Sequence, residues 1–373
     1  TDDPASMHFD FADLLLEVLE RKASDLHISA GSHPQLRIRG RLTPLEDYPK
    51  LSPQDTREVI YSILTNDQRQ RLETDWQIDF AYSIPSVARF RVNAYFQRSA
   101  IGAAFRLIPH DIKSIDELGL PAVCHEMAHK PRGFVLVTGP TGSGKSTSLA
   151  AIIDEINRTR HDHILTVEDP IEFLHPHKNC LVNQREIGSD AQTFGYGLKA
   201  ALRQDPDVIL VGEMRDLETI QTALTAAETG HLVFATLHTQ DAPQTIDRII
   251  DVFPHNQQGQ VRMQLAVGLQ GIVTQTLVPT ADGEGRCVAA EVLVPTAGVR
   301  NLIREGKIHQ IYSLIQTGAN HGMQTMDASL AGLVRAGRIT MATAETRSSN
   351  PTELRRLIEG GPATAPEASR VAA

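Results

Sequence analysis

The segment Gly139–Ser146 carries the residue types needed to hold a nucleoside triphosphate. It reads Gly-Pro-Thr-Gly-Ser-Gly-Lys-Ser and fits the pattern GxxxxGK[ST] in full. Glycines let backbone N–H groups close around phosphate oxygens, and the helix that follows such a loop adds partial positive charge. The lysine can reach the β and γ phosphates, and Ser146 can bind Mg²⁺. We therefore predict a site for ATP and Mg²⁺. Its nucleotide-binding residues are Gly139, Thr141, Gly142, Ser143, Gly144, Lys145, Ser146 and Thr147.

Acidic residues follow two short apolar stretches further along the chain. Glu168 ends one stretch and Glu213 comes just after the other. Hydrolysis needs an acid that positions water and one that helps to hold the metal, so both are predicted site residues, with Glu213 as general base. Gly212 stands where a metal-binding Asp is usual, which leaves part of the metal shell to water or another acid. Glu213 could instead cap a helix or pair with Arg215, and Glu168 could form a structural ion pair.

Two histidines bracket a third apolar stretch, one at each end. His231 precedes it and His238 closes it. A strand rises roughly 3.3 Å per residue, so the two rings cannot share one metal ion. His238 could sense the γ-phosphate, although an isolated histidine is more often a hydrogen-bonded structural residue.

A stretch rich in arginine and free of Asp and Glu runs from Ile84 to His110. Its arginines can form a solvated face of an edge sheet. Alternatively, some of these guanidinium groups reach a nucleotide, most simply one held by a neighbouring subunit, because arginine donates two parallel bonds to phosphate.

Alternating apolar strands and helices must position these side chains. From Arg132 the predicted strands are nearly all apolar, as expected for a parallel sheet buried on both faces, in a doubly wound α/β core. Those strands are Phe134–Thr138, Ile164–Val167, Val208–Val211 and Leu232–Thr236. A helix is predicted at Thr147–Ile156, directly after the loop, and from Pro254 the chain reads mostly helical.

The first third of the chain predicts a small α+β unit. Phe11–Arg21 has helical periodicity. Short strand patterns follow, separated by Gly and Pro. They lie at Asp25–Ser29, Gln35–Ile38, Asp79–Tyr82, Phe90–Phe96 and Ala103–Leu107.

Composition narrows the class of protein. A chain of 373 residues is long enough for two domains, and a net charge of −9 argues against a general nucleic-acid binder. Three scattered cysteines predict neither a disulfide framework nor a zinc site and fit a reducing compartment. With no apolar run of about 18 residues and an acidic, polar start, we expect neither a membrane-spanning helix nor a signal peptide. Met7 reads as a natural start.

Taken together, these motifs resemble the secretion ATPase superfamily that drives type II secretion and type IV pili. Four motifs stand in the expected order over roughly Phe11–Arg338. They are the Walker A loop Gly139–Ser146, an Asp box around Thr166–Glu172, an atypical Walker B at Gly212–Asp216 and a His box at Gly230–His238.

One segment resembles the retraction ATPases (PilT type) within that superfamily. Gly298–Glu305 is similar to their AIRNLIRE signature, with Gly and Val at its first two positions. Extension ATPases usually carry a four-cysteine zinc site, which this chain lacks. The resemblance implies a partner or retraction role for Arg300, Asn301, Leu302, Ile303, Arg304 and Glu305.

The resemblance also implies a fold, an assembly and further roles. The fold is α/β, with a PAS-like domain (7–110), a linker (111–121), a RecA-like ATPase domain with a helical C-terminal part (122–360) and a disordered tail (361–373). The expected assembly is a cytoplasmic hexamer, peripheral at the inner membrane, that works on a pilus platform protein and acts on pilin indirectly. Glu213 becomes the catalytic glutamate, Glu168 and His238 belong to the site, and Arg91 and Arg106 contact the nucleotide across a domain or subunit boundary.

Three alternatives stay open at this point. The chain could be a paralogous motor of type II secretion or DNA uptake, or an accessory retraction motor. It could be a RecA-like nucleic-acid translocase, although no aromatic and basic stacking surface is evident. It could also bind nucleotide without turnover, which the intact Lys145, Ser146 and Glu213 argue against.

Overall fold

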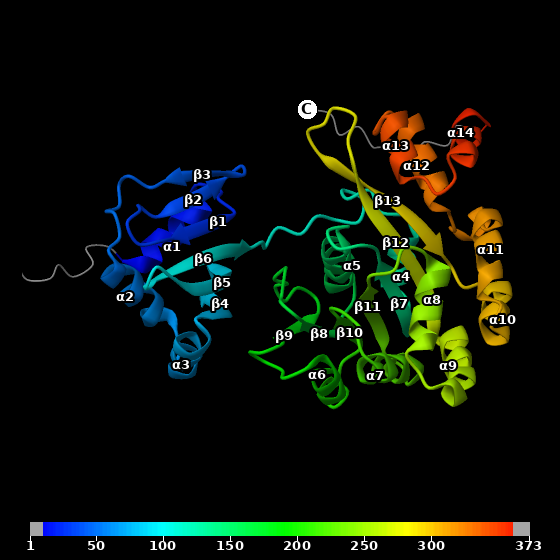
Figure 1. The fold of residues 1–373 in the computed structure, drawn as a ribbon. Coiled ribbons are helices and arrows are strands. Elements are labelled where there is room, and N and C mark those ends of the chain that lie inside the picture. The colour runs from blue at the N-terminus through cyan, green and yellow to red at the C-terminus, as the bar shows by residue number, and fades with distance from the viewer. Residues whose placement is uncertain (1–9, 361–373) are drawn as a thin grey trace, which may run out of the picture. The chain divides into compact units, whose positions relative to one another are not determined.

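The computed structural model describes residues 10–360 and divides the chain between Pro109 and His110 into two compact units (Figure 1). Each unit has a hydrophobic core of its own. The predicted tail (361–373) and Met7 lie outside the described residues.

The first unit contains a six-stranded antiparallel sheet. Its strand order is β3-β2-β1-β6-β5-β4. The strands are β1 (Asp25–Ile28), β2 (Gln35–Ile38), β3 (Arg41–Pro44), β4 (Gln77–Ile84), β5 (Ala88–Gln97) and β6 (Ala100–Ile108). The five strands predicted for this unit are confirmed with small changes at their ends. The exposed β3 was not predicted.

Three helices complete the first unit. The predicted helix is confirmed as α1 (Phe11–Glu20), whose Phe11, Leu14 and Leu15 are buried in the core. The helices α2 (Pro53–Ile63) and α3 (Asn66–Asp75) were missed. Both begin with a reciprocal capping box, and this sequence signal could have revealed them.

The second unit is built on a seven-stranded mixed sheet in the order β13-β12-β7-β11-β10-β8-β9. All neighbouring strands are parallel except β12 and β13. The strands are β7 (Gly133–Thr138), β8 (His163–Glu168), β9 (Leu181–Glu186), β10 (Val208–Val211), β11 (Leu232–Leu237), β12 (Leu269–Pro279) and β13 (Arg286–Leu293). The four predicted strands are confirmed, and so is the α/β fold class.

Helices cover both faces of this sheet. Side chains of successive strand residues point to opposite faces, and the strands are apolar on both, so both faces have to be buried. In β7, Phe134 and Leu136 belong to one buried cluster, while Val135 and Val137 belong to another. The helices between residues 123 and 268 are α4 (Val123–Ala128), α5 (Lys145–Thr159), α6 (Phe194–Ala201), α7 (Leu217–Glu228), α8 (Ala242–Asp251) and α9 (His255–Gly268).

The prediction of a mostly helical chain after Pro254 is wrong for residues 269–293. These residues form a long antiparallel hairpin, β12–β13, drawn in yellow in Figure 1. The outer part of the hairpin carries a small core of its own, in which Val278 packs with Leu330 and Leu354. The helices that follow are α10 (Ala297–Glu305), α11 (Ile311–Thr317), α12 (Met326–Arg335), α13 (Met341–Arg347) and α14 (Pro351–Gly360). Over residues 10–360, we find no helix long and apolar enough to cross a membrane.

Candidate active site

Three of the predicted catalytic side chains, Glu168, Glu213 and His238, meet at one edge of the second sheet. Parallel strands present their carboxyl ends at the same edge, and Glu168 ends β8, Glu213 follows β10 and His238 follows β11. A cleft of about 430 Å³ opens there. It is lined by Thr141, Gly142, Gly144, Lys145, Ser146, Thr147, Glu168, Asp169, Pro170, Glu172, Phe194, Gly212, Glu213, Thr236, His238, Leu277 and Arg286.

The phosphate loop lies between β7 and α5, as the sequence predicted, although α5 begins earlier than expected, at Lys145. Gly139 has φ 144°, and a Cβ at this position would lie 2.3 Å from the carbonyl oxygen of Gln275 on β12. Only glycine fits there. Gly144 also has a positive φ, 86°, and stands at the N-cap of α5, so the loop turns sharply into the helix and directs its N-terminus at the cleft.

The side chain of Lys145 is held over the loop by backbone carbonyl groups of that loop. Its Nζ donates to the carbonyl oxygens of Gly139 (2.8 Å) and Pro140 (3.0 Å) and lies 3.3 Å from Nδ1 of His238. Burial lowers the pKa of Lys145, while Glu213 and Glu172 oppose this shift. The ammonium group can therefore exchange two carbonyl oxygens for phosphate oxygens without leaving the loop.

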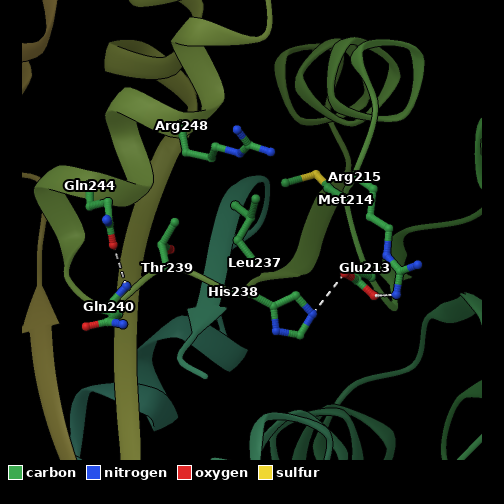
Figure 2. Close-up of a pocket in the computed structure, with 9 residues that line it drawn as sticks. All are labelled: Glu213, Met214, Arg215, Leu237, His238, Thr239, Gln240, Gln244 and Arg248. Atoms are coloured by element: carbon green, nitrogen blue, oxygen red, sulfur yellow. Dashed lines mark hydrogen bonds and ion pairs between the residues drawn. The ribbon is translucent and has the colours of Figure 1, made fainter. Parts of the chain in front are cut away.

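Glu213 is held by two basic side chains (Figure 2). Its Oε1 lies 2.9 Å from Nε2 of His238, and its Oε2 accepts a hydrogen bond of 2.6 Å from Arg215. An ammonium group can only donate, so Nδ1 of His238 accepts from Lys145 and Nε2 carries the proton given to Glu213. Burial would raise the pKa of Glu213, but its contacts with Arg215 and His238 hold that pKa below the ordinary value. The group is a carboxylate, as a general base must be.

Glu168 differs from Glu213 in that its pKa is raised rather than lowered. Burial raises its pKa to about 7, even though Thr166 and Gln184 donate hydrogen bonds to it and lower the pKa. Gly212 explains how it comes so close to the Walker B strand. A Cβ on Gly212 would lie 3.2 Å from Cα of Glu168, so an aspartate at this position would press on the backbone of β8.

The cleft has donors that suit Mg²⁺. Ser146 lines it, and its hydroxyl makes no hydrogen bond within the described part of the chain. The carboxyl groups of Glu168 and Glu213 line the same space. Mg²⁺ prefers oxygen ligands and is usually held by few protein groups together with water and phosphate. The residues therefore fit the ion.

His231 takes no part in the cleft. It lies before β11, at the opposite end of the strand from His238, and its Nδ1 is 3.0 Å from the carbonyl oxygen of Ala226 near the end of α7. This is the structural role that the sequence left open.

Arg91 and Arg106 lie in the first unit as paired neighbours on β5 and β6, and both are exposed. Nε of Arg106 donates to Asp25 (2.9 Å), which is buried. Burial raises the pKa of Asp25, but hydrogen bonds from Ser24 and Arg106 outweigh it and lower the pKa below its ordinary value. The guanidinium group is thus anchored through Nε, while the side chain as a whole stays 70% exposed. A role at the nucleotide stays a prediction for both arginines.

The retraction-type signature falls on α10 and has two different faces. Val299 and Ile303 are buried in the main core. Arg300 is half-buried, and its Nη1 donates to the carbonyl oxygens of Ala266 (2.6 Å) and Val267 (3.0 Å), which end α9. Leu302 packs against the same core. The exposed members of the segment are Gly298, Asn301, Arg304 and Glu305.

Gly298 is the second residue of α10, after the N-cap Thr296. At a helix start glycine costs less than in the interior, and a Cβ there would make only an ordinary contact of 3.5 Å with Leu314. The departure from the signature is therefore harmless to the helix.

Several cleft residues were missed by sequence reasoning. Leu277 and Arg286 come from the hairpin that read as helical, and Phe194 begins α6. Gln275 on β12 supports the loop through its Nε2, which donates to the carbonyl oxygen of Ser143 (2.7 Å). No local motif marks these residues, because they reach the cleft through the order of strands in the sheet.

Fold and site together define a P-loop ATPase. The chain also matches the protein family described as "Type II/IV secretion system protein" over residues 2–297, and it belongs to that family.

Two relatives and one solved structure are similar to this chain over most of its length. It is 50% identical to the "Type IV pilus retractation ATPase PilT" of Pseudomonas aeruginosa over 92% of this chain and 99% of that protein. It is 42% identical to the "Type IV pilus ATPase PilU" of the same organism over 94% and 92% of the two chains. A crystal structure of the pilus retraction motor PilT with bound ADP superposes with a TM-score of 0.86 at 50% identity, covering 94% of this chain and all of that one.

Proposed function

We propose that this protein is the ATP-driven motor of type IV pilus retraction, the process behind twitching motility. Two observations taken together support this most strongly. A complete P-loop cleft is set in a chain that is 50% identical, over nearly its whole length, to a protein named as the pilus retraction ATPase.

In the proposed reaction, ATP binds with its phosphates over Gly139–Thr147 and Lys145 on the β and γ phosphates. Ser146, assisted by Glu168, would hold Mg²⁺, which would neutralise charge on the phosphates. Glu213 takes the proton of the attacking water, and His238 keeps the carboxylate in place through its Nε2–H. Arg91 and Arg106 supply further positive charge to the phosphates from the first unit of the same or a neighbouring subunit.

The working assembly is a homohexamer in the cytoplasm that docks on an inner-membrane platform protein and acts on pilin through it. The γ-phosphate favours a closed arrangement of each subunit, and its loss favours an open one, so hydrolysis around the ring does mechanical work. The absence of a membrane-spanning helix among residues 10–360 is compatible with docking through a partner.

The exposed face of α10 is the part of the signature suited to that partner. Asn301 and Arg304 are exposed, whereas Arg300 and Leu302 hold the helix to the body of the unit. A variant at Arg300 and Leu302 would therefore mix a coupling defect with a folding defect.

The test is complementation of pilus retraction in cells that lack their own motor. We expect this chain to restore retraction, and the Asn301→Ala, Arg304→Ala variant to hydrolyse ATP normally without restoring it. Arg335→Ala, which removes an exposed arginine on α12, serves as the matched control and should restore retraction. If the parent chain hydrolyses ATP but never restores retraction in a host with matched pilus proteins, the proposal fails in favour of a secretion or DNA-uptake motor.

A further inference from the structure

A second hollow lies behind the catalytic pair. It has a volume of about 520 Å³ and belongs entirely to the second unit (Figure 2). Its lining residues are Glu213, Met214, Arg215, Leu237, His238, Thr239, Gln240, Gln244 and Arg248. Glu213 and His238 are the two residues that line both this hollow and the nucleotide cleft. Their contact, 2.9 Å between Oε1 and Nε2, is therefore the partition between the two spaces.

The hollow has the donors expected of a site for a small anion. Two of its lining side chains are guanidinium groups, Arg215 and Arg248, and Glu213 is its single carboxylate. Arg248 is exposed and makes no hydrogen bond or ion pair within residues 10–360, and Figure 2 shows it extended across the hollow toward Met214. Oε1 of Gln244 accepts from the backbone N–H of Gln240 (2.8 Å), which leaves the amide N–H groups of Gln244 as donors.

A continuous chain of contacts leads from the phosphate site to this hollow. Nζ of Lys145, which is to hold the γ-phosphate, lies 3.3 Å from His238, and His238 contacts Glu213. Glu213 in turn binds Arg215 at 2.6 Å. A phosphate ion formed in the cleft is charged and carries several acceptor oxygens. It can replace Glu213 as the partner of Arg215, because arginine binds phosphate through the same parallel donors.

We propose that this hollow is the exit site for inorganic phosphate, which leaves the cleft between Glu213 and His238 and is received by Arg215 and Arg248. The inference rests on the proposed hydrolysis at Lys145 and Glu213. It assigns the order of events after hydrolysis: the Glu213–His238 contact opens, phosphate leaves by the side away from the loop, and ADP remains until the cleft itself opens.

Three variants with the same change in net charge test the proposal. Arg248→Gln removes a guanidinium group that is proposed to donate hydrogen bonds to phosphate. Gln244→Glu adds a repelling carboxylate while keeping the oxygen that accepts from Gln240. Arg203→Gln, the control, removes an exposed arginine that lines neither space and has no side-chain partner in the described part of the chain.

The experiment follows one turnover of ATP by the assembled protein with two readouts. Acid quenching measures cleavage of the γ-phosphate bond, and a fluorescent phosphate-binding sensor measures release. We expect the ratio of release rate to cleavage rate to fall about tenfold in Arg248→Gln and in Gln244→Glu, the loss of one charge-assisted bond, and to stay at the parent value in Arg203→Gln. Inhibition of steady-state ADP production by added inorganic phosphate should need about tenfold more phosphate in Arg248→Gln.

Each other outcome overturns the proposal or separates it from the proposed function. If both pocket variants release phosphate at the parent ratio, the hollow is not on the exit path. If cleavage slows as much as release, the hollow serves the chemical step instead. If Arg248→Gln does not assemble, Gln244→Glu decides alone, since it keeps the local hydrogen bond. If the parent protein shows no cleavage in the quench assay, the ATPase assignment fails before the exit is at issue.

Discussion

Replacing Arg300 by alanine tests whether the retraction-type signature acts through folding or through a partner. Both of its hydrogen bonds come from one nitrogen, Nη1, and they end on the carbonyl oxygens of Ala266 and Val267. We therefore count them as one charge-assisted bond, which contributes about 1.5–3 kcal/mol. The charge also lies at the C-terminus of α9, where a cation adds about 0.3–1 kcal/mol. Because Arg300 is half-buried, we take the lower end, about 2 kcal/mol.

The measurement is the melting temperature of the purified protein, together with hydrogen exchange along α9. A loss of about 2 kcal/mol lowers the melting temperature of a unit of this size by about 4–8 °C. The amides of the last turn of α9 should exchange faster. Arg304→Ala is the control: Arg304 is exposed and has no bond in the described chain, so its melting temperature should stay within about 2 °C of the parent value. A melting temperature of Arg300→Ala equal to that of Arg304→Ala would refute the capping role.

Two further predictions concern a buried carboxyl group and the phosphate loop. Glu291 on β13 is buried with a hydrogen bond from the backbone N–H of Ala242, and burial raises its pKa from 4.5 to about 7. The native state then holds a proton that the unfolded state releases between pH 4.5 and 7, so this residue lowers stability as pH rises through that range. Glu291→Gln should match the parent near pH 4.5 and exceed it by about 2–3 kcal/mol at pH 8 in urea unfolding, and a constant difference at every pH would contradict this. Gly139→Ala should abolish ATP binding, because its Cβ would meet the carbonyl oxygen of Gln275. At Gly142 a Cβ meets nothing within 4 Å, so Gly142→Ala should lose only about 1–2 kcal/mol of folding stability to its φ of 80°. This variant should still bind in a titration with a fluorescent nucleotide. Equal binding by the two variants would contradict the steric role of Gly139.

The positions of Glu168, Glu213 and His238 on the sheet were easier to predict from the sequence than the complete set of helices and strands. A buried strand followed by a P-loop is a local pattern. The strand that ends at Glu168 and the strands that precede Glu213 and His238 are short, apolar runs that periodicity recognises. Parallel strands place their carboxyl ends at the same edge of the sheet, and β11, β10 and β8 are neighbours in it, so those three side chains lie close together. The contact of His238 with both Lys145 and Glu213 could not be predicted, because it depends on side-chain geometry across three strands.

The hairpin β12–β13 and the helix α3 show why the rest was missed. β12 follows α9 directly, with Leu269 right after Gly268, and a register shift between Leu269 and Gly271 breaks its alternation. α3 is polar throughout, and only Leu72 is buried, so it has no apolar stripe to detect. The dual character of the signature on α10 was hidden for a different reason. Arg300 looks like a surface residue in sequence, and only the position of the end of α9 makes it a structural cap.

The most direct test of the central claim is to measure the retraction of labelled pili in cells that depend on this chain, with Glu213→Gln beside the parent. The amide keeps the shape of the side chain but cannot accept the proton of water, so hydrolysis should fall by about 100-fold or more while ATP still binds. We expect pili to retract with the parent chain and to stay extended with Glu213→Gln. Retraction at the parent speed by Glu213→Gln would contradict the central claim.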